Sequence, residues 1–496
     1  MSVSLYTAAQ TRELDRTAIS TLGIAGFVLM QRAAAAAWRV LKKRWPNARR
    51  IVVMCGPGNN GGDGYLLART AKDAGLDARV IALAKPKETS PDALRAHDEW
   101  IASGGKIATS TDPIPDADVY VDALFGTGTQ RPSEGFARAL IDHVNRYPAR
   151  VLSLDIPSGI DSDTGNVLRA AVRATATVSF VAHKRGLFTS DALDHRGELI
   201  LDTLGLPDDL YERFDADAQL LDMAHMSRWL PPRERNAHKG KFGHVLAVGG
   251  DYGTCGAIRM AGEAAMRVGS GLTSIATRPE NISAINAGRP ELMAHAVSDA
   301  ASMQTLLQSA SVSVVAVGPG LGQSNWSRSL LTAAVAANRP TVLDADALNI
   351  LSQKFFPLPA VSVLTPHPGE AARLLGCDVA AIESDRFKAA RAIAERYRAV
   401  VVLKGGGSLI AHPAGPVAVC PWGNPGMASG GMGDVLTGVI AGLLAQGLNA
   451  WRAARFGVGL HAQAADAAAG NGEAGMIASD LFPHLHKLRN ARAGHD

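Results

Sequence analysis

The sequence predicts an α/β protein built as two three-layer α/β/α domains. Short β-branched runs alternate with helical segments in both halves of the chain, which is the pattern of strands joined by crossover helices. The strand runs are apolar throughout, as expected for parallel strands that helices cover on both faces. A chain of 496 residues is also too long for one hydrophobic core, so at least two domains are expected.

The first half is expected to fold around one parallel sheet. A helical segment over residues 8 to about 43 precedes the first strand. Ligands of such sheets bind beyond the carboxyl ends of the strands, so the loops that follow the strands are the candidate site. The expected strands span residues 51–55, 78–83, 119–123, 151–155 and 175–181, and the helices between them span 62–74, 91–102 and 134–146.

The periodic pattern is lost between about residues 203 and 240, which indicates a domain boundary. We place it after residue 222, so that the domains are 1–222 and 223–496. A second series of strands and helices follows. The two series share no visible sequence repeat, so we expect two different domains rather than a duplication. The second series of strands is expected at residues 244–249, 272–277, 312–317, 341–344, 361–364 and 400–403.

Composition excludes several classes of protein. The chain has 50 basic and 46 acidic side chains and no long basic run, so nucleic acid is not expected as a partner. The four cysteines form no CxxC, which argues against a disulfide framework or a structural zinc site and fits a reducing cytoplasm. No signal peptide is expected, and the most apolar windows, 33–40 and 438–444, are too short to span a bilayer, so a soluble protein is expected.

The stretch from Asn424 to Gly433 is the most informative motif. Small residues here lead directly into Asp434 and a helical run over 435–444. The first N–H groups of a helix and its dipole favour phosphate oxygens, and Asp434 lies where a phosphate acceptor would arrive. A glycine-rich helix-packing loop would explain the glycines but not this carboxylate. Met432 offers no hydroxyl to a phosphate, so no side-chain role is assigned to it.

Other loops of the second half follow strands in the same way. No GxxxxGK[ST] motif is present, so phosphate binding must come from other loops. Lys404 and the small residues 405–408 follow one strand and suit close approach of a phosphate. A β-hairpin turn would also explain these glycines but would leave the lysine incidental. Further strand-end loops lie at 318–322, 344–349 and 365–370; His367 in the last is either a structural histidine or a ligand contact.

The first half carries a different glycine loop. Residues 56–61 match GxGxxG, which alone is weak evidence for a dinucleotide fold, and the acidic residue expected after the next strand is missing. Asn59, Asn60 and Asp63 are oxygen-bearing groups that a pyrophosphate turn does not need and that suit a hard cation. Three more such residues follow strands and are expected to converge with them, although each alone could be a turn residue: Asp122, Asp155 and Ser158.

The runs GPGNNGGDG, VDALFGTG, LDIPSGIDSDTG and FVAHKRGL together resemble the N-terminal domain of the NAD(P)H-hydrate epimerases, over about residues 1–220. The resemblance implies a Rossmann-like sheet that binds the hydrated dinucleotides NADHX and NADPHX near a potassium ion (K+). By that likeness the potassium ligands are Asn60, Asp122 and Ser158. The substrate contacts are Asn59, Asn60, Gly61, Gly62, Asp63, Gly126, Thr127, Gly128, Thr129, Gln130, Arg131, Pro132 and Asp155.

The runs HKGKFGH, GPGLG, TPHPGE, KGGGS and NPGMASGGMGD resemble, in this order, the ADP- or ATP-dependent NAD(P)H-hydrate dehydratases, a branch of the ribokinase-like fold, over about residues 225–490. The likeness implies ADP as the co-substrate, with a magnesium ion (Mg2+). The hydrate contacts would be Ala257, Gly322, His367 and Asp434. The adenine nucleotide would be held by Lys404, Gly405, Gly406, Gly407, Ser408 and Gly433.

The expected function is therefore repair of hydrated NADH and NADPH by a cytoplasmic enzyme. Asp155 is the hypothesised acid/base of epimerisation, and Asp434 the base that directs the substrate hydroxyl onto a phosphate. A homo-oligomer is expected for such domains, although no sequence feature shows it. Two alternatives are a kinase of a small vitamin-like alcohol and a non-catalytic nucleotide sensor.

Overall fold

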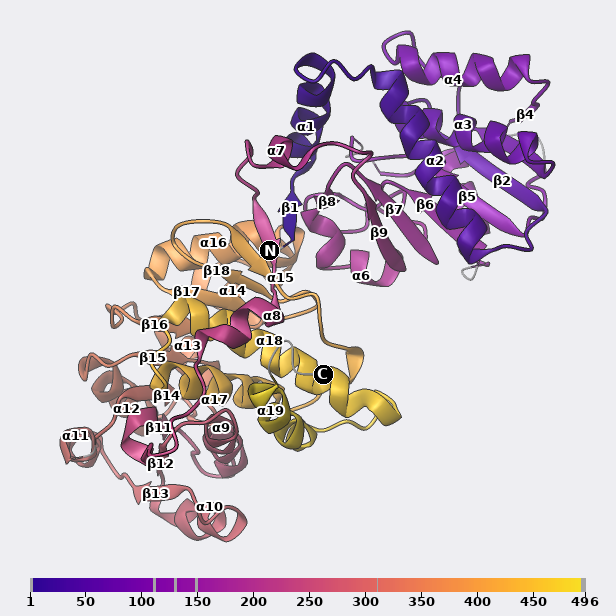
Figure 1. The fold of residues 1–496 in the computed structure, drawn as a ribbon. Helices are drawn as coiled ribbons and strands as arrows, with labels where there is room; N and C mark the ends of the chain where they lie inside the picture. The colour runs from indigo at the N-terminus through magenta and orange to yellow at the C-terminus, as the bar shows by residue number, and fades with distance from the viewer. Residues whose placement is uncertain (1–2, 110–112, 129–131, 148–149, 310, 492–496) are drawn as a thin grey trace. The chain divides into compact units, whose positions relative to one another are not determined.

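The computed structural model describes residues 3–109, 113–128, 132–147, 150–309 and 311–491 (Figure 1). The chain divides into two compact units, one comprising Ser4–Ala218 and the other comprising Val3 and the described residues from Gln219 onward. The boundary expected after residue 222 lies close to this division. No helix in the described part of the chain is long and apolar enough to cross a membrane.

The N-terminal unit contains a seven-stranded sheet in which all neighbouring strands are parallel. If the seven strands of this sheet are numbered 1 to 7 along the chain, starting with β2, their order in the sheet is 3-2-1-4-5-6-7. The order therefore reverses between strands 1 and 4, which are β2 and β5. Open α/β sheets bind ligands beyond the strand ends at this point. In spatial order the strands are β4 (Ile107–Ala108), β3 (Asp77–Ala82), β2 (Arg50–Cys55), β5 (Val119–Ala123), β6 (Val151–Leu154), β7 (Ala176–Phe180) and β9 (Glu198–Asp202).

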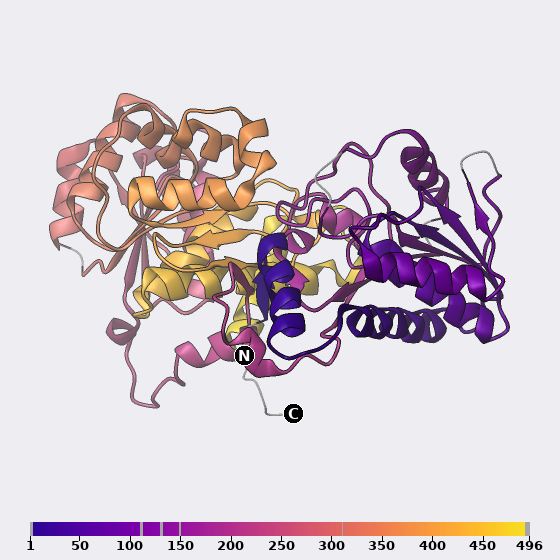
Figure 2. The same ribbon diagram turned by 90° about the horizontal axis from the view of Figure 1, so that it is seen from above.

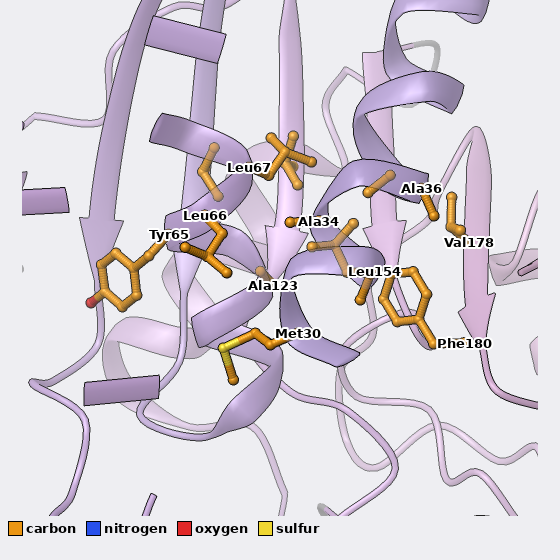
Figure 3. Packing of buried hydrophobic residues seen from close by; sticks show 14 of the residues in the cluster. Met30, Ala34, Ala36, Tyr65, Leu66, Leu67, Ala123, Leu154, Val178 and Phe180 are labelled. Atoms are coloured by element: carbon orange, nitrogen blue, oxygen red, sulfur yellow. The ribbon is translucent and has the colours of Figure 1, made fainter. Parts of the chain in front are cut away.

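Helices cover both faces of this sheet, as its continuously apolar strands predict. On one face, α2 (Gly26–Arg44) and α3 (Asn59–Asp73) pack on the strands, and α4 (Pro91–Ala102) packs on α3. Figure 3 shows this layer, in which Met30 and Ala34 of α2 and Leu67 of α3 lie with Leu154 and Val178 of the sheet. On the other face, α5 (Gly135–Val144) packs against the opposite side chains of β2 and β5.

Two expectations for this half were wrong. The helix expected over residues 8–43 is two helices, α1 (Ala8–Ser20) and α2, separated by a turn in which Gly23 has φ +68°. The expected loop from Asn59 to Asp63 is the first turn of α3, because the glycine turn ends at Gly58, its N-cap. The shorter elements are β1 (Ser4–Tyr6), which pairs with β8 (His183–Lys184), α6 (Ala192–His195) and α7 (Asp208–Tyr211).

The C-terminal unit repeats the strand order 3-2-1-4-5-6-7 in its parallel strands and then adds two antiparallel ones. The order reverses between β11 and β14. The parallel strands are β13 (Met293–Ala296), β12 (Leu272–Thr277), β11 (His244–Val248), β14 (Val314–Val317), β15 (Thr341–Leu343), β16 (Ser362–Leu364) and β17 (Val400–Leu403), followed by β18 (Leu409–Ala411) and β19 (Val417–Val419).

The strands of this unit are buried on both faces, except for the edge strand β13, whose residues are exposed or half-exposed. Along the strands of its sheet run α17 (Met432–Ala445) and α18 (Ala450–Ala468), the yellow helices of Figures 1 and 2, which share one core cluster with α9 (Cys255–Arg267). The remaining helices are α8 (Met223–Met226), α10 (Ile282–Gly288), α11 (Ala300–Ser309), α12 (Asn325–Ala336), α13 (Ala345–Gln353), α14 (Pro368–Leu375), α15 (Val379–Ser384), α16 (Arg386–Tyr397) and α19 (Leu481–Asn490); β10 spans Ala218–Leu220. The α/β fold class predicted from the strand pattern is confirmed.

Candidate active sites

The first candidate site lies where β2 and β5 end. A Cβ built on Gly56 would lie 1.8 Å from the backbone oxygen of Leu124, so only glycine allows the two strand ends to approach this closely. Gly58 caps α3 without a side-chain hydrogen bond, so no side chain competes for the first N–H groups of this helix. Such groups suit an anionic ligand.

Asp122 and Ser158, from the next two strand ends, contact each other directly. The Ser158 hydroxyl donates to Asp122 Oδ1 at 2.6 Å, and the Ser158 N–H and the Ser153 hydroxyl each donate to Oδ2 at 2.8 Å. Burial raises the pKa of Asp122, although these hydrogen bonds oppose the shift. The loops after β5 and β6 are thereby joined.

Asn60 completes this group on the side of α3. Its amide nitrogen and oxygen are buried, and neither has a hydrogen-bond partner among the described residues. A Cβ built on Gly126 would lie 3.3 Å from the Asn60 Cβ and 3.3 Å from Asp155 Oδ2, so Asn60 and Asp155 flank the same backbone. Buried amides are normally hydrogen-bonded, and an orphaned one beside a glycine loop indicates a ligand position.

Asp155 is held in an unusual backbone conformation and paired with a buried lysine. Its φ is +66°, which a non-glycine residue rarely adopts. The Thr127 N–H donates to its Oδ2 at 3.3 Å, and the Lys184 ammonium forms an ion pair with its Oδ1. Lys184 has no exposed surface and also donates to Ser179 Oγ at 3.1 Å and to the Phe180 carbonyl at 2.8 Å.

Two further carboxyl groups interact with this pair. Burial raises the pKa of Asp63 well above its usual range, and the charges of Asp155 and Asp15 add to the effect. Burial also raises the pKa of Asp15 to about 6, although Lys184 opposes the shift. The site therefore combines the Asp155–Lys184 ion pair with two carboxyl groups whose pKa values are raised.

The second candidate site lies where β11 and β14 end. The Asp251 N–H donates to the Gly320 carbonyl at 2.6 Å, and the Gly322 N–H donates to Asp346 Oδ2 at 2.8 Å. The loops at 250–254, 318–322 and 344–349 are thus linked in one rim. Ala257 lies half-buried in the first turn of α9, directly after the first of these loops.

Lys404 and two buried acids form the centre of this rim. Lys404 Nζ donates to Asp344 Oδ1 at 2.8 Å and lies 3.7 Å from Glu370 Oε2. The Thr437 hydroxyl of α17 donates to Asp344 Oδ2 at 2.8 Å. Burial disfavours the Lys404 ammonium, but Asp344 and Glu370 outweigh it, and the pKa of Lys404 is raised. The lysine therefore keeps its charge.

Asp434 lies in the first turn of α17, as the sequence predicted, beside this lysine. Burial, and then the negative charge of Asp344, raise the pKa of Asp434 to about 7, while Lys404 opposes the shift. A Cβ built on Gly433 would lie 3.3 Å from Lys404 Nζ, so the helix start packs closely on the lysine. Met432 points into the core and is 6% exposed, which agrees with the absence of an assigned role.

Two alternatives from the sequence are both partly right. The loop from Lys404 to Ser408 is the turn of the antiparallel β17–β18 hairpin, yet its lysine is bound to Asp344 and is not incidental. His367 is the N-cap of α14, where its Nδ1 accepts from the Gly369 N–H at 3.0 Å, and its ring remains half-exposed on the rim. Burial and then Lys404 lower the pKa of His367. Its Nε2 lies 3.3 Å from Glu370 Oε1, so only the half-exposed side of the ring is available to a ligand.

The comparisons with known proteins agree with this division into two sites. The family described as NAD(P)H-hydrate dehydratase matches residues 245–487, and the YjeF-related protein N-terminus matches residues 26–186. The bifunctional NAD(P)H-hydrate repair enzyme of Coxiella burnetii is 47% identical over 98% of this chain and 99% of its own length. The chain belongs to the family of bifunctional NAD(P)H-hydrate repair enzymes.

Solved structures of relatives cover the C-terminal half. The ADP/ATP-dependent NAD(P)H-hydrate dehydratase of Bacillus subtilis, co-crystallised with ATP and Mg2+, is 30% identical with a TM-score of 0.50, over 54% of this chain and 96% of that one. A ribokinase-like superfamily protein of Enterococcus faecalis is 28% identical with a TM-score of 0.52, over 56% of this chain and 96% of that one. The ribokinase-like fold expected for this half is confirmed.

The residues of this family member fit the metal ions that the sequence implies. Asn60, Asp122 and Ser158 offer oxygen atoms from adjacent strand ends, the Asn60 amide is unpaired, and a cation would compensate the buried Asp122 carboxylate. Among the described residues no group of three or more His, Cys, Asp or Glu could hold a metal by itself.

Sequence reasoning missed several residues of the repair enzyme's rims, and three of its predicted contacts lie outside the described residues: Thr129, Gln130 and Arg131. Lys184 follows β7 within one of the recognised runs, so its strand-end position was an available signal. Asp344 also follows a strand, but no sequence motif indicated that Lys404 and Thr437 would contact it. The missed residues are Asp15, Ser153, Ser179, Lys184, Asp344, Glu370, Ser429 and Thr437. The Ser429 hydroxyl, in the loop expected to bind phosphate, is buried and has no hydrogen-bond partner within the described part of the chain.

Proposed function

We propose that this chain is a bifunctional enzyme that repairs NADHX and NADPHX. Its N-terminal domain, 1–222, interconverts the R and S epimers, and its C-terminal domain, 223–496, dehydrates the S epimer at the expense of ADP, releasing AMP and phosphate. The observation that carries the proposal is that each unit places a largely buried carboxylate, Asp155 or Asp434, near a lysine, Lys184 or Lys404, at a glycine-lined strand end. A kinase of a vitamin-like alcohol would leave the N-terminal site without a purpose.

Epimerisation needs a proton to leave and return to the C6 hydroxyl while C6 is planar or the ring is open. Asp155 performs this transfer, since its Oδ2 lies beside Gly126 and its Oδ1 is fixed by Lys184. The dinucleotide binds to the first turn of α3 and to the first residues of the loop that follows β5. Asn60, Asp122 and Ser158 would hold the potassium ion, which supplies a fixed positive charge beside the substrate.

Dehydration needs a better leaving group than water. Asp434 takes the proton of the C6 hydroxyl as that oxygen attacks the terminal phosphorus of ADP, and the bond from this phosphorus to AMP breaks. The C6–O bond then breaks, phosphate leaves with the electron pair, and loss of a C5 proton restores the dihydropyridine ring. Lys404 stabilises the charge on the transferred group, and the phosphates with the rim carboxylates would hold magnesium.

The substrate contacts of the second site are Ala257, Gly322 and His367 together with Asp434, and the nucleotide lies against the hairpin 404–408 and Gly433. The close packing of Gly433 on Lys404 and the orphaned Ser429 hydroxyl support this placement. We also place the enzyme in a reducing cytoplasm as a homo-oligomer; the four free cysteines support the first statement, and light scattering tests the second.

The direct test is the absorbance at 340 nm after purified protein meets both epimers of NADHX, with ADP, ATP or no nucleotide, in potassium and magnesium. Full recovery of NADH that depends on one nucleotide supports both activities and identifies the co-substrate. Recovery of the S fraction alone would remove the epimerase from the proposal. A stable phosphorylated product without NADH would favour the kinase.

Dehydration is expected to lose activity on the acid side of neutrality. A base works only when ionised, and burial raises the pKa of Asp434 to about 7. The rate constant of dehydration should therefore fall about tenfold for each pH unit below 7. Initial rates at saturating substrate and ADP between pH 5.5 and 8.5 measure this, and a flat profile would remove Asp434 as the base.

Gly433→Ala is expected to weaken nucleotide binding without loss of stability. Alanine suits a helix better than glycine, but its Cβ would lie 3.3 Å from Lys404 Nζ and would displace the lysine or the phosphate. The KM for ADP should rise about tenfold, equivalent to ~1.4 kcal/mol. Gly470→Ala, where a Cβ meets nothing within 4 Å, is the matched control. Equal KM values in the two variants would contradict the placement of the nucleotide.

A further inference from the structure

Lys184 occupies a position that is costly for an ammonium group. It has no exposed surface, and an unpaired charge at such a depth would be strongly disfavoured. Its Nζ contacts three acceptors, Asp155 Oδ1, Ser179 Oγ and the Phe180 carbonyl, which equals the number of its N–H donors. The ammonium therefore has no donor left for a substrate, so its effect must pass through Asp155.

The contacts of Asp155 show what that effect is. Asp155 N–H donates to the Val178 carbonyl at 2.7 Å, and its Oδ1 faces the lysine. Its Oδ2 faces the Thr127 N–H and Gly126, where the loop after β5 begins. Val178 lies in β7 and Lys184 lies in β8, which follows β7 directly. This short segment therefore fixes both the backbone of Asp155 and its Oδ1 atom.

We propose that Lys184 is the positioning residue of the epimerisation site, which holds the inner oxygen of Asp155 with a fixed positive charge and directs that carboxylate at the substrate. This rests on the proposed role of Asp155 as the acid/base. Positioning by a fixed charge is a common way to prepare a catalytic carboxylate before the substrate arrives.

The neighbours of Lys184 explain why this carboxylate needs a cation. Asp63 and Asp15 face the pair with further negative charge, and burial together with Asp155 raises the pKa of Asp63 well above its usual range. Burial, and then Lys184 and Arg196, lower the pKa of His183 to about 4, so the histidine gives no positive charge at neutral pH. Without Lys184, the carboxyl groups of Asp15, Asp63 and Asp155 would lose the cation that forms the ion pair with Asp155.

Lys184→Met tests the proposal because it keeps most of the side-chain volume and removes the charge. Epimer exchange is followed by chromatography without ADP, so that dehydration does not consume the S epimer. An opposite charge lowers a carboxyl pKa by about 1–3 units, so the acid limb of kcat/KM should move up by at least 1 unit. Rates measured on the acid limb should fall at least tenfold with an unchanged KM.

Two further variants separate positioning from structure. Ser179→Ala removes one acceptor of the lysine but leaves its charge, and should leave the acid limb in place. Lys184→Met combined with Asp155→Asn makes the buried pair neutral, so it should restore the thermal stability that Lys184→Met loses but none of the exchange. Dehydration of S-NADHX in the other domain normalises the amount of active protein in each preparation.

The outcomes are distinct. An unmoved acid limb in folded Lys184→Met, or a raised KM with unchanged kcat, would overturn the positioning role. Full exchange by Asp155→Asn would instead remove the proposed acid/base and leave the lysine without a catalytic partner. If Lys184→Met does not fold, Lys184→Arg decides: an acid limb at the position of the original enzyme supports the role of charge, and a shifted one overturns it.

Discussion

Asp434→Asn is expected to abolish nucleotide-dependent recovery of NADH while epimer exchange continues at its original rate. The amide keeps the shape of the side chain but cannot take the hydroxyl proton, and a positioned base is worth about 10²–10⁴-fold in rate. The two activities belong to separate compact units, so the loss should stay within the C-terminal one. Single-turnover dehydration and chromatographic epimer exchange on the same preparation measure both.

Stability gives an independent readout of the same substitution. The folded-state pKa of Asp434, about 7, lies above the usual carboxyl value, so the folded protein binds the proton more tightly than the unfolded chain. Ionisation of Asp434 therefore lowers the free energy of unfolding as the pH rises from about 4 to about 7. Asp434→Asn should raise the Tm of the C-terminal unit at pH 8 and change it little at pH 4.

An inactive variant with unchanged or lower Tm at pH 8 would mean that Asp434 is not held as a high-pKa carboxyl group. Loss of both activities in a folded protein would contradict the independence of the two sites. The expected combination of greater stability and lost activity is typical of a residue kept for chemistry at a cost in folding.

Asp155→Asn is expected to abolish enzymatic epimer exchange, again by about 10²–10⁴-fold, while dehydration of pure S-NADHX is unchanged. The physical reason is loss of the group that moves the hydroxyl proton. With a racemic mixture and ADP, the variant should return NADH quickly from the S fraction and then only at the spontaneous rate of exchange. The two-phase time course at 340 nm is the measurement.

This variant needs a folding control, because it leaves the Lys184 ammonium buried without its carboxylate. Breaking a buried ion pair costs about 3–5 kcal/mol, enough to lower the Tm of the N-terminal unit. The double variant with Lys184→Met removes that cost and should remain inactive. Exchange at the original rate in either folded variant would exclude Asp155 as the acid/base.

The strand pattern predicted the architecture well because parallel strands buried on both faces leave a clear apolar signal. The strands at Val119–Ala123, Leu272–Thr277 and Val400–Leu403 and the helix at Pro91–Ala102 match their expected bounds to the residue. The first helix was predicted too long because a single glycine, Gly23, separates two helical patterns without interrupting the composition around it.

The sites were predictable where residues follow strands and not where partners come from helices or distant loops. The expected meeting of Asp122 with Ser158 follows from adjacent parallel strands. Thr437 lies on α17 and reaches Asp344, 93 residues earlier, and Asp15 on α1 interacts with Lys184, so neither had a local signal. Charge and burial of such partners depend on tertiary packing, which no motif records.

Each compact unit contains the parallel strands of its own candidate site, and the solved dehydratase of Bacillus subtilis covers 54% of this chain and 96% of its own length. Under the proposed activities, joining the two halves in one polypeptide fixes their stoichiometry at one to one. Translation alone then guarantees that every molecule able to consume the S form is made together with one able to renew it from the R form. The amounts of the two domains therefore need no separate control of gene expression.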